Sequence, residues 1–219
     1  MSWFRTFTWT VVMPVKVLGQ AKSRLAVLAG PRRPELALAF ASDTVSAVMD
    51  CPAVARVLVV TSDTSAAGAL SSLGASVVPD LPDAGLNEAL SYGAAVAARR
   101  WPGSGIAALT ADLPALRPGE LATALDAAAV SSAVSAFVPD AAYVGTTMYA
   151  VAPGVPFTPK FGGESRARHA ASGAAELLPD DIPGLRRDVD TPDDLRAAVA
   201  LGTGPRTAAL ASELLAGTA

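Results

Sequence analysis

The sequence predicts an α/β protein in which helices cover both faces of a mostly parallel central sheet. Short apolar runs rich in valine recur along the chain, and a segment with helical character follows most of them. The runs are apolar throughout, which indicates strands that are buried on both faces. Strands of this kind, each followed by a helix, are typical of parallel sheets. At 219 residues the chain is expected to form a single domain, residues 1–219.

The first two thirds of the chain contain five of these apolar runs, among them "TVVMPV", "ARVLVVT" and "GIAALTAD". They predict strands at residues 10–15, 55–61, 75–79, 105–112 and 133–138. The segments between them predict helices at residues 34–49, 64–73, 87–100 and 118–129, the third of which is rich in alanine. Each strand and the helix behind it would add one parallel strand to the sheet.

The pattern changes after the fifth strand. Residues 143–151 predict a strand that no helix precedes, so we expect an antiparallel or mixed pairing there. A loop rich in proline and glycine, 153–163, leads into a helix at 164–173. The segment "LRRDVDTPDDL", 185–195, is expected to form a last strand that enters a helix, and 206–215 a terminal helix.

Charge and residue usage exclude several classes of function. Charged residues make up only 17%, the net charge is −3 and no basic run exceeds two residues, so we expect no nucleic-acid partner. The single cysteine, Cys51, excludes an internal disulfide and suits a reducing compartment. The single histidine, His169, excludes a histidine-rich metal site. The run at 10–15 is too short for a membrane span or a secretory signal, so a cytoplasmic protein without membrane contact is expected. No feature predicts an oligomeric state.

Three cations lie close together in the loop after the first strand. Lys16, Lys22 and Arg24 fall within nine residues of an otherwise mildly acidic chain, which favours a small anion such as a triphosphate. The chain has neither a Walker loop nor a dinucleotide-binding glycine fingerprint. A solvated basic loop is the alternative. Further on, Asn87 in "GLNEAL" either caps a helix or contacts a nucleobase or ribose.

Acidic residues follow two other segments. Asp112 ends the strand "GIAALTAD", where a carboxylate can hold a divalent ion, although an Asp turn before Pro114 is the alternative. Asp188 and Asp190 lie two apart, so on an extended segment they share a face. Asp190 is assigned mainly to capping the helix that begins at Pro192. Asp112 and Asp188, together with substrate phosphates, would suffice for Mg²⁺.

A second anion site is predicted in "KFGGESRARH", residues 160–169. The backbone N–H groups of Gly162 and Gly163 and the hydroxyl of Ser165 would surround an anion at a helix start. The segment "GTT", 145–147, could add a hydroxyl, whereas His169 is expected on a helix face. A loop whose glycines only turn the chain is the alternative. Two anion sites with paired carboxylates between them describe an enzyme that joins two phosphorylated substrates.

With these motifs assembled, the chain resembles the 2-phospholactate/phosphoenolpyruvate guanylyltransferase family of coenzyme F-420 biosynthesis. The matching segments run through nearly the whole chain: "PVKVLGQAKSRLA", "GLNEAL", "ADLPAL", "GTTM", "KFGGESRARH" and "DVDTPDDL". The resemblance implies a Rossmann-like nucleotidyltransferase fold, GT-A-like and similar to the guanylyltransferase of molybdenum-cofactor maturation. One departure is Ala111, where the family's relatives often have glycine before the metal-binding aspartate.

The resemblance also implies a reaction and a set of site residues. GMP would pass from GTP to the phosphate of a small three-carbon acid, with Mg²⁺ as cofactor and release of pyrophosphate. Phosphoenolpyruvate is the first choice of acceptor, with 2-phospholactate and 3-phosphoglycerate left open, and the product could pass to a downstream transferase. The implied residues are Lys16, Lys22 and Arg24 for catalysis and the triphosphate, Asn87 for the nucleotide, Asp112 and Asp188 for the metal, and Thr147, Gly162 and Ser165 for the acceptor.

Two other functions remain as alternatives at this point. The first is a nucleotidyltransferase of the same fold with a molybdopterin or sugar-phosphate acceptor, and the absence of a glycine-rich first loop counts against it. The second is a non-catalytic nucleotide-binding protein, and the presence of both Asp112 and Asp188 counts against that.

Overall fold

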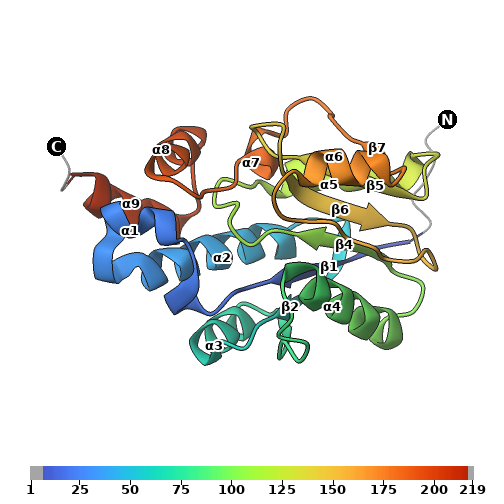
Figure 1. Cartoon of the computed structure of the whole chain (residues 1–219), viewed down its shortest axis with the longest axis horizontal. Helices are drawn as coiled ribbons and strands as arrows, with labels where there is room; N and C mark the ends of the chain where they lie inside the picture. Colours follow the sequence, from blue (N-terminus) through green and yellow to red (C-terminus); the bar gives the residue numbers. More distant parts are fainter. Residues whose placement is uncertain (1–6, 217–219) are drawn as a thin grey trace.

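A seven-stranded sheet with the strand order β3-β2-β1-β4-β6-β5-β7 forms the centre of the molecule (Figure 1). The structure is a computed structural model, and it describes residues 7–216. The strands are β1 (Trp9–Pro14), β2 (Val54–Val60), β3 (Ser76–Val78), β4 (Gly105–Leu109), β5 (Ser135–Pro139), β6 (Thr146–Val151) and β7 (Ala175–Glu176). The five apolar runs predicted as strands correspond to β1 to β5, so this part of the prediction is confirmed.

The direction of β6 determines how the edge of the sheet is built. β1 to β4 pair in parallel, whereas β6 runs antiparallel to both β4 and β5, which confirms the pairing expected for residues 143–151. Leu109 pairs with Met148, and the N–H of Thr110 donates to the carbonyl of Thr147 at 3.0 Å. The amino end of β6 therefore lies beside the carboxyl ends of β1 and β4, the edge where open α/β sheets bind ligands.

Helices cover both faces of the sheet (Figure 1). One face carries α2 (Arg33–Met49), α3 (Thr64–Ser72) and α5 (Pro118–Val130), and the other carries α4 (Leu86–Arg100) and α6 (Ser165–Ala171). Val11 and Val59 belong to the core of the first face, while their neighbours Val12 and Val60 belong to the core of the second. Because successive strand residues point to opposite faces, both must be apolar, which explains the continuous apolar runs.

A third group of helices packs on the far side of α2. It contains α1 (Ala26–Ala29), α8 (Pro192–Leu201) and α9 (Pro205–Ala216), and its core includes Phe40 and Leu195. Three 3₁₀ turns, η1 (Leu18–Gln20), η2 (Ser23–Leu25) and η3 (Gly30–Arg32), precede α2, and neither they nor β7 were expected. None of the helices within residues 7–216 combines the length and apolar character needed to cross a bilayer.

The strand predicted at the start of residues 185–195 is wrong. A short helix, α7 (Pro183–Arg186), occupies its beginning, and a loop then leads to α8. The buried carboxylate of Glu120 accepts the backbone N–H groups of Gly184 and Leu185 at 3.2 and 2.8 Å, which fixes the first turn of α7. Gly184 is needed there, because a Cβ atom would lie 2.2 Å from the carbonyl oxygen of Ala115. A contact with α5 therefore overrides the local strand pattern.

The N-cap assigned to Asp190 is also wrong. Thr191 caps α8 by accepting the N–H of Asp194, and the Asp194 carboxylate accepts the N–H of Thr191 in return. This reciprocal arrangement is a capping box, in which the N-cap position belongs to the residue immediately before the first helical turn. The Asp190 carboxylate is left free to point elsewhere, and it accepts a hydrogen bond from Lys22.

Candidate active site

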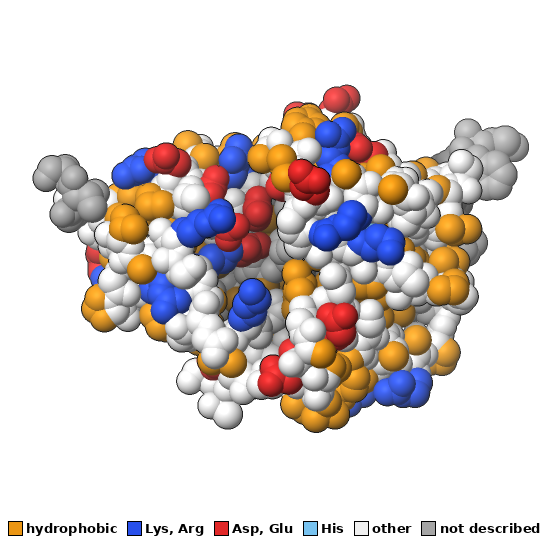
Figure 2. Space-filling view, in the orientation of Figure 1, with side chains coloured by type: hydrophobic (Ala, Val, Ile, Leu, Met, Phe, Trp, Pro, Cys, Tyr) orange, Lys and Arg blue, Asp and Glu red, His pale blue; other side chains and the backbone are white. Residues whose placement is uncertain are grey.

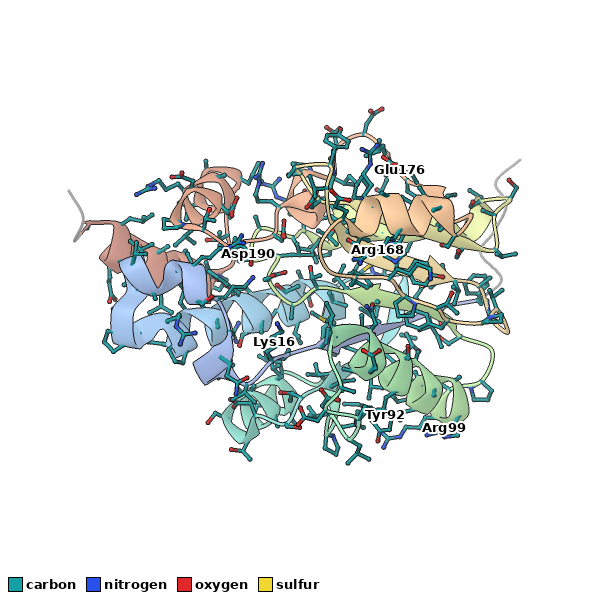
Figure 3. All side chains as sticks on the ribbon, in the orientation of Figure 1. Lys16, Tyr92, Arg99, Arg168, Glu176 and Asp190 are labelled. Atoms are coloured by element: carbon teal, nitrogen blue, oxygen red, sulfur yellow. The ribbon has the colours of Figure 1, made fainter. Side chains whose placement is uncertain are left out.

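A cleft of about 400 Å³ opens at the edge where β1 and β4 end and β6 begins. Six of the residues predicted for the site line it: Lys16, Lys22, Asp112, Gly162, Ser165 and Asp188. Figure 2 shows acidic side chains gathered in a hollow in the middle of the molecule, with lysine and arginine side chains on either side. In Figure 3, Lys16 and Asp190 lie at this hollow on one side, and Arg168 on α6 lies on the other.

Lys22 links two of the acidic side chains in the cleft. Its ammonium group donates to the carboxylate of Asp112 and, at 2.7 Å, to that of Asp190. Burial disfavours the charge on Lys22, but the carboxylates of Asp112 and Asp190 outweigh it and raise the pKa of Lys22 above its ordinary value. Lys22 therefore stays positively charged at any physiological pH. Lys22 has a left-handed backbone conformation (φ 55°), which turns the chain between η1 and η2.

Hydrogen bonds hold the loop that carries Asp112 from two sides. The N–H of Val189 donates to the carbonyl of Asp112 at 3.1 Å. This bond joins the loop of Asp112 to the segment that carries Asp188. On the other side, the hydroxyl of Thr44 on α2 accepts the N–H of Leu113 at 3.1 Å. The loop that carries Asp112 is thus fixed from both the core helix and the C-terminal segment.

The carboxylates of Asp112 and Asp188 fit a divalent cation. Within residues 7–216, Asp112 Oδ1 is buried and has no hydrogen-bonding partner, although Lys22 binds its other oxygen. Burial, and then the nearby charges of Asp112, Asp190 and Asp140, raise the pKa of Asp188 to about 7. The described residues contain no group of three or more His, Cys, Asp or Glu arranged as a metal site. Mg²⁺ needs only one or two carboxylates when substrate phosphates supply further oxygens.

Asp188 should give the metal-free protein a pH-dependent stability. Its carboxyl has a pKa of 3.8 when unfolded and about 7 when folded, so between these values the folded chain binds the extra proton. The Asp188 contribution to the free energy of unfolding therefore decreases as the pH rises through this window. Burial lowers the pKa of His169 from 6.5 to about 4, which gives the opposite slope between those two values. Comparison with Asp188→Asn cancels the histidine contribution.

Thermal melts in a chelator, at about pH 5 and about pH 8, measure this effect. The melting temperature of Asp188→Asn relative to the wild type should increase as the pH rises, because the asparagine has no charge to bury. A difference that stays constant with pH would show that Asp188 is already ionised at the lower pH.

The predicted acceptor segment forms the opposite wall of the cleft. Gly162 and Gly163 have φ values of 92° and 46°, which glycine adopts at little cost, and Ser165 begins α6 with only 1% of its surface exposed. Just before them, Phe161 exchanges two hydrogen bonds with the side chain of Asn87: its carbonyl accepts at 3.1 Å and its N–H donates at 2.8 Å. These two bonds leave one N–H and one oxygen lone pair of the Asn87 amide for any contact with a nucleotide.

Arg24 and Thr147 do not line the cleft. Arg24 is exposed in η2, and its charge, together with those of Lys22 and Lys16, lowers the pKa of Asp190 in the cleft. Thr147 is buried, and its neighbour Thr146 lines the cleft instead, as expected for successive residues of a strand.

Asp140 lines the cleft and was not predicted. Its carboxylate accepts the N–H groups of Val144 and Gly145 at 2.9 and 2.8 Å, which shapes the turn that leads into β6. Asp140 lies two residues after the fifth predicted strand, at the edge of the sheet where ligands bind. This position is the signal that could have identified it.

A second hollow of about 300 Å³ adjoins the cleft. The two share Pro14, Val15, Lys16 and Leu86. The second hollow also contains Asp80 and Asp83, and Asp80 Oδ1 accepts the N–H of Asp83 at 3.3 Å. Ionised carboxylates of this kind are hydrogen-bond acceptors. Lys16 thus stands between the hollow that contains Asp80 and Asp83 and the cleft that contains Asp112 and Asp188.

Comparisons with known proteins show what this chain is similar to. The chain is 62% identical over 207 residues to phosphoenolpyruvate guanylyltransferase of Thermomonospora curvata, covering 94% of this chain and 90% of the relative. It is 59% identical to the protein of the same name from Streptosporangium roseum, covering 95% and 93%. A nucleotidyl transferase from Methanothermobacter thermautotrophicus has a similar fold, with a TM-score of 0.62 at 18% identity over 90% of this chain and 98% of the other. No protein-family model matches the chain.

Proposed function

The chain belongs to the phosphoenolpyruvate guanylyltransferase family, and on that basis we propose that it transfers GMP from GTP to the phosphate of phosphoenolpyruvate and releases pyrophosphate, as a step of coenzyme F-420 biosynthesis. The observation that carries this proposal is the cleft itself. Asp112, Asp188 and Lys22 form one wall, and the glycine segment that begins at Gly162 forms the other. A cation-binding pair thus faces a wall suited to a second anion, as joining two phosphorylated substrates requires.

In this proposal the nucleotide lies across the two hollows. The guanine base would occupy the second hollow, where Asp80 and Asp83 can accept hydrogen bonds. Guanine offers two such donors, N1–H and the exocyclic amine, whereas N1 of adenine is an acceptor and would face a carboxylate unfavourably. The triphosphate would then pass Lys16 toward Lys22 and the two metal-binding carboxylates. Arg24, exposed outside the cleft, would act on the triphosphate only at longer range.

In this proposal the acceptor lies against the opposite wall. Backbone groups of Gly162 and Gly163, with the hydroxyl of Ser165, would hold its anionic groups at the start of α6. Thr147 would contribute through its backbone, because its carbonyl holds Thr110 at the base of the cleft.

The chemistry requires no proton abstraction from the acceptor. An oxygen of the acceptor phosphate, already ionised at neutral pH, attacks the α-phosphorus of GTP, and the bond to the bridging oxygen of the β-phosphate breaks. Pyrophosphate leaves with its new negative charge beside Lys16 and Lys22, which stabilise it electrostatically. Asp112 and Asp188 would hold Mg²⁺, which when bound reduces the repulsion between the two anionic substrates. Alignment of the two phosphates in one cleft supplies much of the remaining catalysis.

Pyrophosphate release by the purified protein tests this proposal. Phosphoenolpyruvate, 2-phospholactate and 3-phosphoglycerate are each supplied with Mg²⁺ and GTP, with parallel reactions containing ATP or no acceptor. Release with GTP and phosphoenolpyruvate, and little with ATP, is the expected result. Release with another acid would reassign the acceptor. No release with any acid, also after addition of the transferase that consumes the reactive diphosphate product, would overturn the proposal.

Ser165→Ala should weaken binding of the acceptor more than binding of GTP. Ser165 lines the cleft at the start of α6, where the acceptor is proposed to bind, so loss of its hydroxyl would remove one hydrogen bond to the acceptor. One bond to a charged group corresponds to about a tenfold increase in the KM for the acceptor. Steady-state kinetics with each substrate varied in turn measures both constants. An unchanged KM for the acceptor would move the acceptor site elsewhere.

A further inference from the structure

We propose that Asn87 and His169 are positioning residues that clamp the acceptor loop, residues 160–163, in the geometry that binds the acceptor. The inference rests on the proposed function, because it takes Gly162 and Gly163 as part of the acceptor site. Neither side chain lines the cleft, so each would act through the loop backbone.

Asn87 holds the loop from the side of α4. Both polar groups of its side-chain amide bond to the backbone of Phe161, the residue directly before Gly162. This double contact fixes the position of the Phe161 peptide groups much as a neighbouring strand would. Leu86, the residue before Asn87, lines both hollows. The first turn of α4 is therefore in contact with the nucleotide side of the cleft and with the acceptor loop at once.

His169 holds the loop from the side of α6. Its ring is fully buried, and its Nε2 accepts the N–H of Lys160 at 2.9 Å. Because Nε2 accepts, the neutral ring carries its proton on Nδ1, which donates to the hydroxyl of Thr146 at 3.0 Å. Thr146 itself lines the cleft. The imidazole thus joins the acceptor loop to the first residue of β6 through its two nitrogen atoms.

The ring of His169 also has a packing role, which must be separated from the hydrogen bonds. It stacks on Tyr149 with ring centres 4.9 Å apart and on Phe137 at 5.5 Å, and the edge of Phe161 meets it at 5.4 Å. A phenylalanine at position 169 could keep these ring contacts and would lose both nitrogen atoms. His169→Phe therefore tests the hydrogen bonds with little loss of packing.

The loop needs such a clamp because its two glycines are intrinsically flexible. Gly162 and Gly163 lose more backbone entropy on ordering than other residues do, and an anion held by backbone N–H groups requires those groups to be fixed in advance. Beyond the clamp, the loop accepts two further hydrogen bonds from the described residues, one from Arg168 Nη2 to the carbonyl of Phe161 at 3.3 Å and one from the N–H of Ser165 to the carbonyl of Gly163 at 2.9 Å. Release of the clamp should therefore weaken acceptor binding while the nucleotide half stays intact.

Four variants test the proposal by steady-state kinetics and by calorimetric titration with phosphoenolpyruvate. Asn87→Ala and His169→Phe are each expected to raise the KM and the Kd for the acceptor about tenfold, with the KM for GTP changed less than about twofold. His169→Gln, whose amide oxygen can still accept the Lys160 N–H, should recover part of the loss. Asn87→Asp keeps the acceptor for the Phe161 N–H and should fall between Asn87→Ala and the wild type. Arg99→Ala, at the other end of α4 (Figure 3), is the matched control.

Equal changes in both KM values, or a lower melting temperature with an unchanged acceptor KM, would reduce the two residues to a structural role and overturn the proposal. Hydrogen exchange at the amides of Lys160 and Phe161 gives a readout that does not depend on turnover. Exchange should accelerate in His169→Phe and Asn87→Ala respectively, and unchanged exchange would show that the clamp does not hold the loop. A wild-type protein that shows this protection but releases no pyrophosphate would mark a failure of the proposed function instead.

Discussion

Asp112→Asn is expected to lower kcat about a thousandfold while the protein keeps its fold. Asp112 is the acid with a buried oxygen, Oδ1, that has no partner among residues 7–216, and its other oxygen binds Lys22. An asparagine has nearly the same shape, so packing and the backbone contact to Val189 should survive. It carries no charge, however, and it replaces one oxygen by an amide nitrogen that cannot bind a cation.

The same reasoning applies to Asp188→Asn, since Mg²⁺ held by two carboxylates loses half of its protein ligands with either change. Pyrophosphate release over a series of Mg²⁺ concentrations measures the loss, with circular dichroism and thermal melts as checks of folding. Asp193→Asn is the matched control, because its side chain is 92% exposed and pairs with Arg196 on α8, outside the cleft. Wild-type activity in Asp112→Asn would remove that residue from the metal site.

Most elements of the fold could be predicted because their signals are local. Valine-rich runs buried on both faces identify the strands, and the missing helix before residues 143–151 indicated the change of direction at β6. The strand predicted at the start of residues 185–195 was wrong because the signal there is not local. The conformation of this segment depends on Glu120, whose carboxylate reaches the N–H groups of Gly184 and Leu185 from another helix. No periodicity within the segment carries that information.

For the site too, some residues could be selected from local sequence signals, whereas others depend on the tertiary structure. Lys16 and Asp112 lie within three residues of the ends of β1 and β4, and the rule that ligands bind at the carboxyl edge of such sheets is enough to make them candidates. The contacts of Asn87 and His169 with the acceptor loop depend on tertiary structure, since Asn87 and Phe161 lie 74 residues apart. The pairing of Lys22 with Asp190 was missed because a cap at Asp190 explained that residue locally, until Thr191 proved to be the cap.

Lys22→Met should lower kcat about a hundredfold or more and should also make the metal-free protein more sensitive to pH. Lys22 is the cation between Asp112 and Asp190, and its charge also opposes the rise in the pKa of Asp188. Without it the acids repel one another uncompensated, and the triphosphate loses a cation at the point where charge develops on pyrophosphate. Methionine keeps much of the apolar stem, and it adopts the left-handed backbone at position 22 no more easily than lysine does.

Arg24→Met is the control variant for this prediction. Arg24 is exposed, lies two residues from Lys22 and does not line the cleft, so its loss should affect the KM for GTP modestly and kcat little. In thermal melts with a chelator, Lys22→Met should lose more stability than the wild type between about pH 5 and about pH 8, because its Asp188 carboxyl resists ionisation more strongly. If Arg24→Met instead proved the more damaging change, the triphosphate would have to lie along the outer side of the η2 turn. Asp112 and Asp188 would then face the acceptor alone, and the proposed path of the triphosphate past Lys16 and Lys22 would be wrong.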